Sequence, residues 1–348
     1  MAILLAGIKK VSVEQDRFEI KNKSGYEERI RKARRIVWIV MGISLAVFFS
    51  IAVLAIINEG VTKFISTVYS INVFYYLAAF AVLFAGYMLR FPKWEIYLKT
   101  LGVKIKRRDN LMIYLSMYSM DITPGRWGRG IVSYTLNKVT GSRFATTFPA
   151  VVADIFTDFL GFGILAILTS IFVRKYVLLS VFVTAVLLIP FVFLYVKGPF
   201  EFFKKKLSRV GTLRSFWDVG DLYFKEKSKL GKRDYLLSIF YTVPSMMLTG
   251  MALYFVILAF GIHVTIAQIP LVLFIYSSSV LFGIVTGVPA TLGVTDAVLV
   301  GYLTFFFPVS EMSFGVAATI TIFFRIVSVW FVQGFGSVAL FQTMKRWN

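Results

Sequence analysis

Two aspartates within an apolar stretch, Asp154 and Asp158, are the residues whose type and spacing most directly indicate chemistry. They are four positions apart, so both side chains project from one face of a helix. A charge at the centre of a bilayer costs about 2.5–3.5 kcal/mol on insertion scales, so we expect both carboxylates to have cationic partners. The candidates are Arg126, Arg129 and Arg325, and Arg325 is the only charged residue within the 29 residues 313–341.

These charges admit two interpretations, and the sequence leaves both open. In the first, they form ion pairs that lock broken helices to their neighbours, which is a structural role. In the second, the arginines recognise a lipid phosphate through paired hydrogen bonds, and the aspartates tune or gate them. The second interpretation gives a set of candidate residues for binding a lipid headgroup: Arg126, Arg129, Asp154, Asp158, Asp296 and Arg325.

Two segments that contain glycine and proline break the apolar pattern beside these charges. The first contains Pro124, Gly125 and Gly128, and the second, GVPATLGVTDA at residues 287–297, contains Pro289 and Gly293. Glycine permits unusual backbone angles, and no Gly-Lys-Ser/Thr follows that would indicate a nucleotide loop. We predict that these residues form backbone turns within broken helices, which in a bilayer occur where they line a site.

The composition excludes several kinds of catalytic site. The chain has no Cys and a single His, which excludes a thiol nucleophile, a thiolate metal site and a His-based metal cluster. A membrane enzyme acting on a lipid phosphate would have only Asp154, Asp158 and Asp296 as carboxylates, and no catalytic constellation accompanies them. We therefore expect no enzymatic activity, no metal and no cofactor.

The elements that carry these residues are those of an all-α polytopic integral membrane protein. The chain of 348 residues is 58% hydrophobic and 16% charged, whereas a soluble domain is about 25% charged. Several apolar runs reach the roughly 20 residues that cross a bilayer. Six full spans are predicted, at residues 36–57, 68–89, 149–173, 176–196, 235–260 and 313–341. Two broken or re-entrant elements, at 111–139 and 266–307, bring the membrane helices to about eight.

The distribution of basic residues predicts the topology. Residues 1–35, 90–110 and 197–234 and the C-terminus hold 30 of the 38 Lys and Arg residues, and the positive-inside rule places all four segments, with both termini, on the cytoplasmic side. Residues 111–148 must then enter and leave on one side, as a re-entrant hairpin around Pro124 would. Residues 266–307 must likewise start and end outside, either as a re-entrant pair or as two crossings. Inverted, broken elements that meet near the midplane are typical of transporters built from inverted repeats.

The predicted domain organisation is a basic cytoplasmic segment, residues 1–35, followed by a single transmembrane domain, residues 36–342. The loop 197–234 has helical spacing of its apolar residues, which favours a basic amphipathic helix on the inner leaflet. A solvated connector that only sets topology is the alternative. Because the basic residues lie in loops between spans, anionic lipid headgroups are the expected partner, and nucleic acid is not.

At these motifs the sequence resembles the membrane domain of lysylphosphatidylglycerol synthases and its stand-alone, flippase-like relatives, over about residues 37–342. The family pattern has Pro-Gly-Arg-x-Gly-Glu, then Glu-Arg-x-x-Asp, then Pro-x-x-x-Gly-x-x-Glu and finally an Arg in the last span. Two positions depart from it, because Arg129 stands in place of Glu and Ile155 in place of Arg. The matching residues are Pro124, Gly125, Arg126, Gly128, Asp154, Asp158, Pro289, Gly293, Asp296 and Arg325.

The resemblance implies a cell-membrane domain that translocates or otherwise handles anionic or polyprenyl-linked lipids. The chain ends just after its last predicted span, so we expect it to lack the soluble aminoacyl-transfer domain of a full synthase. Two other functions are considered: a lipid-modifying membrane enzyme or its accessory subunit, and a small-solute carrier. The expected partners are these lipids, with a homo-oligomer left open.

Overall fold

The computed structural model describes residues 61–173, 177–207, 214–285, 291 and 293–347, together with isolated positions between 39 and 57. Residues 47–348 form one unit, and every contact discussed below lies within it. Three predictions fall outside the described residues: the cytoplasmic segment 1–35, the first span at 36–57 and the turn residue Pro289.

The regular elements of the described residues are all helices, which confirms the all-α prediction. Within the described ranges, five helices are long and apolar enough to cross a membrane, and two shorter apolar stretches accompany them: Val177–Val186, the first part of a longer helix, and Val294–Phe306. These five are Val73–Thr100, Phe144–Val173, Lys232–Ala259, Ile266–Ile284 and Phe314–Arg346. The chain is therefore a polytopic helical membrane protein.

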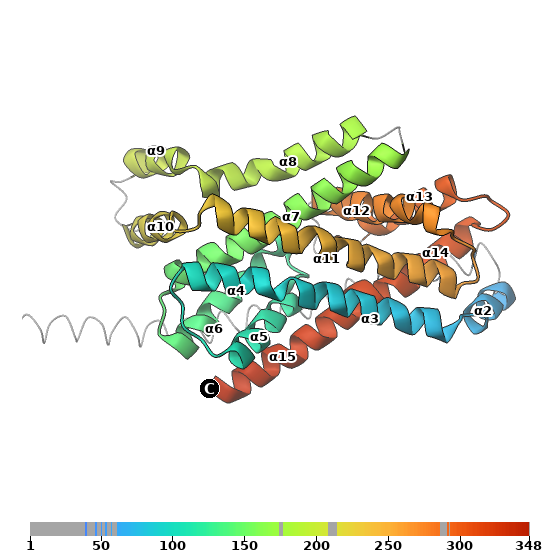
Figure 1. The fold of residues 1–348 in the computed structure, drawn as a ribbon, viewed down its shortest axis with the longest axis horizontal. Helices are drawn as coiled ribbons and strands as arrows, with labels where there is room; N and C mark the ends of the chain where they lie inside the picture. Colours follow the sequence, from blue (N-terminus) through green and yellow to red (C-terminus); the bar gives the residue numbers. More distant parts are fainter. Residues whose placement is uncertain are drawn as a thin grey trace, which may run out of the picture. The chain divides into compact units, whose positions relative to one another are not determined.

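The first of these long helices pairs with an antiparallel partner along its whole length (Figure 1). It consists of α3 (Val73–Leu89) and α4 (Phe91–Thr100), follows α2 (Val61–Tyr69), and packs against α11 (Lys232–Ala259). The amide of Asn72 donates to the carbonyl of Ala259 at 2.8 Å at one end, and Thr100 donates to Asp234 at 3.2 Å at the other. Between them a Cβ on Gly86 would meet α11 backbone, so a small residue lets the two helices approach closely.

The helix that carries the two aspartates, α7 (Phe144–Val173), runs through the centre of the bundle. It contacts α8 (Val177–Tyr195), α10 (Arg214–Lys227), α11 and α12 (Ile269–Val285). Most of α7 is buried. The basic loop at 197–234 contains two helices, α9 (Lys197–Leu207) and α10, and its position on the inner leaflet stays a prediction.

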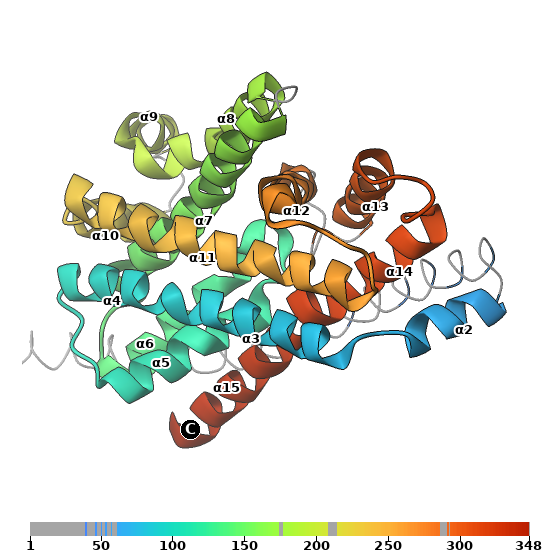
Figure 2. The same cartoon turned by 45° about the vertical axis from the view of Figure 1, so that its right-hand side comes forward.

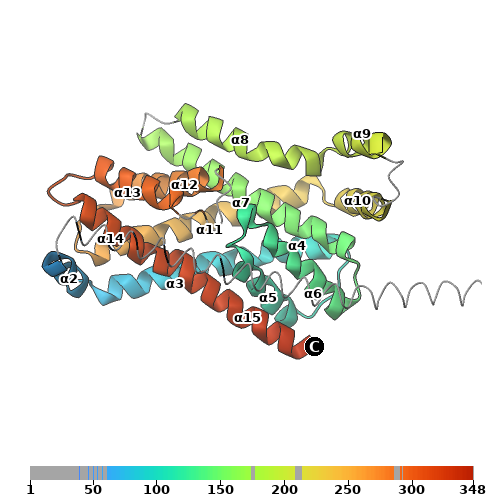
Figure 3. The same cartoon turned by 180° about the vertical axis from the view of Figure 1, so that it is seen from behind.

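The first broken element is a hairpin. It comprises α5 (Arg107–Ser116), the 3₁₀ turns η1 (Met117–Met120) and η2 (Pro124–Gly130), and α6 (Ile131–Thr140). The last helix, α15 (Phe331–Trp347), packs against α5 and η1, as the view from behind shows (Figure 3). A Cβ on Gly336 of α15 would lie 2.5 Å from the amide nitrogen of Ser119, so helix and turn are in backbone contact there.

The second broken element is also a hairpin, formed by η4 (Ile266–Gln268), α12 and α13 (Val294–Phe306). Helices α12 and α13 pack side by side, and α13 continues into contact with α14 (Phe314–Arg325) (Figure 2). Helix α14 is joined to α15 by one π-helical stretch, η6 (Ile326–Trp330), so the last span is continuous but widened at its middle. Such π-bulges occur frequently at functional sites.

Candidate functional site

Asp154 and Asp158 lie on one face of α7, and both are fully buried. Cations reach them from two elements that are distant in sequence: the junction of α3 and α4, and the turn η2. Carboxylates buried this deeply are stable only when paired and hydrogen-bonded. The two aspartates are therefore the centre of a buried ionic network.

Two of the cations, Arg90 and Lys93, come from the α3–α4 junction. The Lys93 Nζ atom lies 2.7 Å from Asp158 Oδ1 and 2.9 Å from Asp154 Oδ1, and Arg90 Nη1 lies 3.4 Å from Asp158 Oδ2. The sequence pattern assigned both residues to a cytoplasmic loop at 90–110, and for these two that assignment is wrong. The helix continues to Thr100, and its three-residue spacing turns Arg90 and Lys93 to one buried face.

The other two cations come from η2 at the tip of the first hairpin. Arg129 Nη1 donates to Asp154 Oδ2 at 2.7 Å and to Asp158 Oδ2 at 3.0 Å, while its Nη2 donates to Asp121 Oδ2 at 2.7 Å. Arg126 Nη1 donates to Asp158 Oδ2 at 3.2 Å. Both arginines thus pair with the aspartates of α7, as the sequence led us to expect.

Arg325, in contrast, pairs with an aspartate of the second hairpin. Its Nε atom donates to Asp296 Oδ1, and the other carboxylate oxygen accepts from the amide of Gly293 at 2.9 Å. Gly293 has a φ of 76° and is the N-cap residue of α13. Asp296 therefore has two roles, because it accepts from the N-cap amide and also pairs with Arg325. Arg325 is the last residue of α14, where the π-helical stretch begins.

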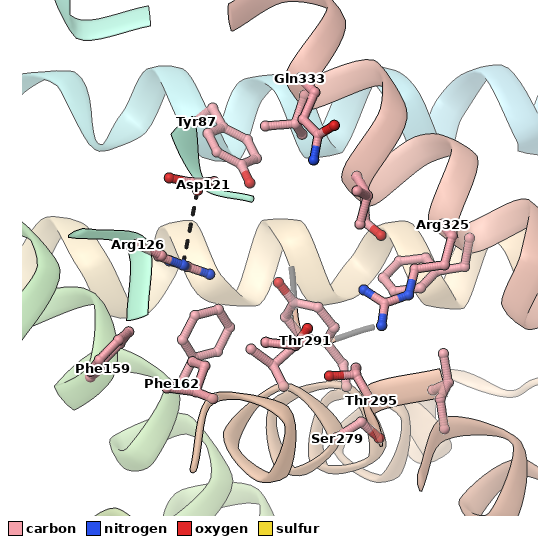
Figure 4. A pocket seen from close by; sticks show the side chains of 18 of the residues that line it. Tyr87, Asp121, Arg126, Phe159, Phe162, Ser279, Thr291, Thr295, Arg325 and Gln333 are labelled. Atoms are coloured by element: carbon pink, nitrogen blue, oxygen red, sulfur yellow. Dashed lines mark ion pairs between the residues drawn. The ribbon is translucent and has the colours of Figure 1, made fainter. Parts of the chain in front are cut away.

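The tips of the two hairpins line one cavity of about 100 Å³ (Figure 4). Arg126 and Arg325 lie on opposite sides of it, and both guanidinium groups face the space between them. Around them are aromatic and aliphatic side chains from α3, α7, α12, α14 and α15, with a few neutral polar groups. The lining includes Tyr87, Arg90, Asp121, Thr123, Phe159, Phe162, Tyr276, Ser279, Thr291, Thr295, Phe324, Ser328 and Gln333.

Three buried polar atoms at the Arg325 end of the cavity have no hydrogen-bond partner among the described residues. They are Arg325 Nη2, Thr295 Oγ1 and Ser328 Oγ. Each belongs to a residue of the cavity lining. Leaving a buried donor or acceptor unpaired costs about 1–3 kcal/mol, so three such atoms on residues of one cavity lining indicate a place for a polar ligand.

The remaining candidate residues take structural positions. Arg129, Asp154 and Asp158 lie outside the lining, held in their ion pairs, so their contact with a lipid stays a prediction. Gly128 donates its amide to Thr123 Oγ1 at 2.7 Å, and a Cβ there would clash with Thr123. Pro124 and Gly125 open η2. Among the described residues, no group of three or more His, Asp or Glu side chains could hold a metal ion.

Comparison with known proteins agrees with this architecture. Residues 38–336 match the family described as the lysylphosphatidylglycerol synthase TM region. The chain belongs to this family. It is also 23% identical over 274 residues to a UPF0104 membrane protein of Methanothermobacter thermautotrophicus, covering 71% of this chain and 79% of that protein. The described residues of the motifs that carried the resemblance lie at the two hairpin tips, on α7 and at the end of α14.

Proposed function

We propose that this protein moves an anionic lipid across the membrane, with the lipid phosphate held in the cavity between Arg126 and Arg325. The observation that carries the proposal is the set of unpaired polar atoms at Arg325, which lies in the last membrane-spanning helix. Family membership supports a lipid substrate, because the family takes its name from the membrane part of enzymes that make a phospholipid.

A lipid phosphate that crosses the hydrocarbon core of a membrane needs partners for its charge. A charge without partners is costly at the bilayer centre, and charge-assisted hydrogen bonds contribute about 1.5–3 kcal/mol each toward offsetting that cost. Arg325 can offer Nη2 to a phosphate while its Nε stays on Asp296, and Arg126 faces the same space from the other hairpin. The acyl chains would remain in the surrounding lipid while the headgroup moves through the protein.

The ionic network behind the cavity has a supporting role in this proposal. Asp158 accepts from Arg90, Lys93, Arg126 and Arg129, which ties α3, α4 and the first hairpin to α7. The ion pair with Asp158 holds Arg126 at the cavity wall. The ion pair with Asp296, which caps α13, holds Arg325. We further propose that both termini and the basic helices α9 and α10 face the cytoplasm, in line with the positive-inside rule.

The test is a lipid-scrambling assay in proteoliposomes with fluorescent phosphatidylglycerol and a membrane-impermeant quencher. Wild-type protein should expose inner-leaflet lipid to the quencher, whereas protein-free liposomes should lose only outer-leaflet fluorescence. Arg325→Gln should lower the scrambling rate about tenfold or more, the equivalent of one charge-assisted hydrogen bond. Arg233→Gln, at an exposed position at the start of α11, is the matched control.

Because Arg325→Gln leaves Asp296 without its partner, a second variant separates function from folding. Arg325→Gln/Asp296→Asn removes both charges, and it should fold while remaining inactive. Full scrambling by the folded double variant would contradict a role for Arg325 in transport. Absence of scrambling by wild-type protein with every anionic lipid would contradict the proposed function itself.

A further inference from the structure

The charges around the cavity do not cancel. Among the described residues of the network and the cavity, five cationic side chains face four carboxylates. The cations are Arg90, Lys93, Arg126, Arg129 and Arg325, and the carboxylates are Asp121, Asp154, Asp158 and Asp296. Arginine stays protonated in proteins, and Lys93 forms ion pairs with two carboxylates. The site therefore has one excess positive charge, which a single negative charge on a ligand would neutralise.

An ammonium group, in contrast, would find no carboxylate in the described part of the lining that is available to it. Asp121 is the lining carboxylate nearest Arg126, and both of its oxygens already accept from Arg129. Asp296 lies behind Arg325, with one oxygen on Arg325 and the other on the Gly293 amide.

Two aromatic rings of the lining are likewise occupied by cations of the protein. The guanidinium of Arg90 lies 4.3 Å from the centroid of the Tyr87 ring, and that of Arg126 lies 5.5 Å from the centroid of Phe162. Ring faces of this kind are the usual means of holding a ligand ammonium. With one face of each ring used by an arginine, Tyr87 and Phe162 are poor receptors for a cationic headgroup.

The neutral polar groups of the lining suit hydroxyl groups. Tyr87 lies near Arg126, Ser279 and Thr291 lie on the second hairpin, and Gln333 lies on α15. Hydroxyl and amide side chains both donate and accept hydrogen bonds, and so do the hydroxyl groups of a glycerol or sugar headgroup. A phosphodiester beside Arg325 would place such a headgroup toward Arg126.

We infer that the cavity selects a lipid whose phosphodiester carries one negative charge and whose headgroup is uncharged and bears hydroxyl groups, and that it disfavours headgroups with an ammonium group. This inference rests on the proposed function and narrows its substrate class. It separates this chain from a carrier of an aminoacylated, cationic lipid, although the family is named for the synthases of such a lipid.

The test compares headgroups in the same proteoliposome assay, with phosphatidylglycerol, phosphatidylethanolamine and lysyl-phosphatidylglycerol as fluorescent substrates. Phosphatidylglycerol should move about tenfold or more faster than the two lipids with an ammonium group, the equivalent of one unmatched charge-assisted contact. Equal or faster movement of lysyl-phosphatidylglycerol would overturn the inference and leave the proposed function standing. No movement of any lipid would overturn both.

A carboxylate added to the lining provides the complementary variant. Gln333→Glu cancels the excess positive charge, so it should lower the scrambling rate of phosphatidylglycerol. The ratio of this rate to the rate for lysyl-phosphatidylglycerol should fall by about tenfold. Gln342→Glu, at an exposed position on the same helix, is the matched control and should keep the wild-type preference. An unchanged preference in folded Gln333→Glu would count against the charge argument. Unlabelled glycerophosphoglycerol tests the source of the phosphodiester: competition by this chain-free compound as strong as by the lipid would contradict a lipid-selective site.

Discussion

Arg126 and Thr291 share an unusual backbone conformation, with φ angles of 61° and 56°, and each lies at the tip of one of the two hairpins that meet at the cavity. Residues with a side chain pay about 1–2 kcal/mol in this left-handed region, and a β-branched residue such as Thr291 is especially disfavoured there. Strain of this kind persists where the surrounding structure holds it, and it gathers at ligand sites. Each hairpin therefore places one residue with a side chain and a left-handed backbone in the cavity lining.

The backbone contact between Gly336 and Ser119 makes α15 sensitive to any side chain at that position. Gly336→Ala should lower the free energy of unfolding by about 1–3 kcal/mol, because the added Cβ meets backbone that cannot move aside. Gly334 is two residues earlier on the same helix and has open space around its Cα. Gly334→Ala should leave the protein as stable or make it slightly more stable. Thermal unfolding in detergent measures both, and equal melting temperatures for the two variants would contradict the close contact.

Lys93 is predicted to be essential for stability, although it lies in a stretch that reads as a basic loop. Lys93→Met removes one cationic partner from the buried carboxylates of Asp154 and Asp158. It should lower the free energy of unfolding by about 3–5 kcal/mol. Lys99→Met, at an exposed position on the same helix, should change stability by less than about 0.5 kcal/mol. Melting temperatures of the two variants test this prediction. A Lys93→Met protein as stable as Lys99→Met would contradict the buried network.

The unpaired hydroxyl groups should matter for transport and not for folding. Thr295→Val and Ser328→Ala remove groups that have no partner among the described residues, so neither should lower the melting temperature. Both should slow scrambling of phosphatidylglycerol, by about threefold to tenfold each, since a neutral hydrogen bond contributes about 0.5–1.5 kcal/mol. A loss of stability without a loss of transport would mean that these hydroxyl groups serve the fold.

The proposed orientation can be tested directly because the chain contains no Cys. Single cysteines at Ser228, after α10, and at Glu311, between α13 and α14, occupy exposed positions toward opposite ends of the helical bundle (Figure 1). In intact cells an impermeant maleimide should label Glu311→Cys and should reach Ser228→Cys only after the membrane is opened. The reverse pattern would invert the orientation, and labelling of both in intact cells would contradict the topology.

The helical elements and the pairing of the α7 aspartates followed from local rules. The four-residue spacing of Asp154 and Asp158, and the cost of charge in a bilayer, required cations, and Arg126 and Arg129 are among those that the structure provides. Counting basic residues by loop, however, treated Arg90 and Lys93 as topology signals. That rule takes no account of burial. The apolar faces of residues 91–98, which include the buried Trp94 and Tyr97, were the signal that the helix continued.

The cavity itself depends on packing that no single stretch of sequence specifies. Its wall is built from α3, the two hairpins, α7 and the last span, and which arginines reach it depends on how those elements pack. Arg325 illustrates this point. It was a candidate partner for the α7 aspartates, yet it pairs with Asp296, because the cap of α13 presents that carboxylate to the start of the π-helical stretch.

The most direct test of the central claim is a cryo-electron microscopy structure of the wild-type protein in nanodiscs that contain phosphatidylglycerol. We predict density for a phosphate within hydrogen-bond distance of Arg325 Nη2, Thr295 Oγ1 and Ser328 Oγ, with the headgroup extending toward Arg126. A cavity that holds only water, with lipid phosphates confined to the outer surface of the protein, would contradict it.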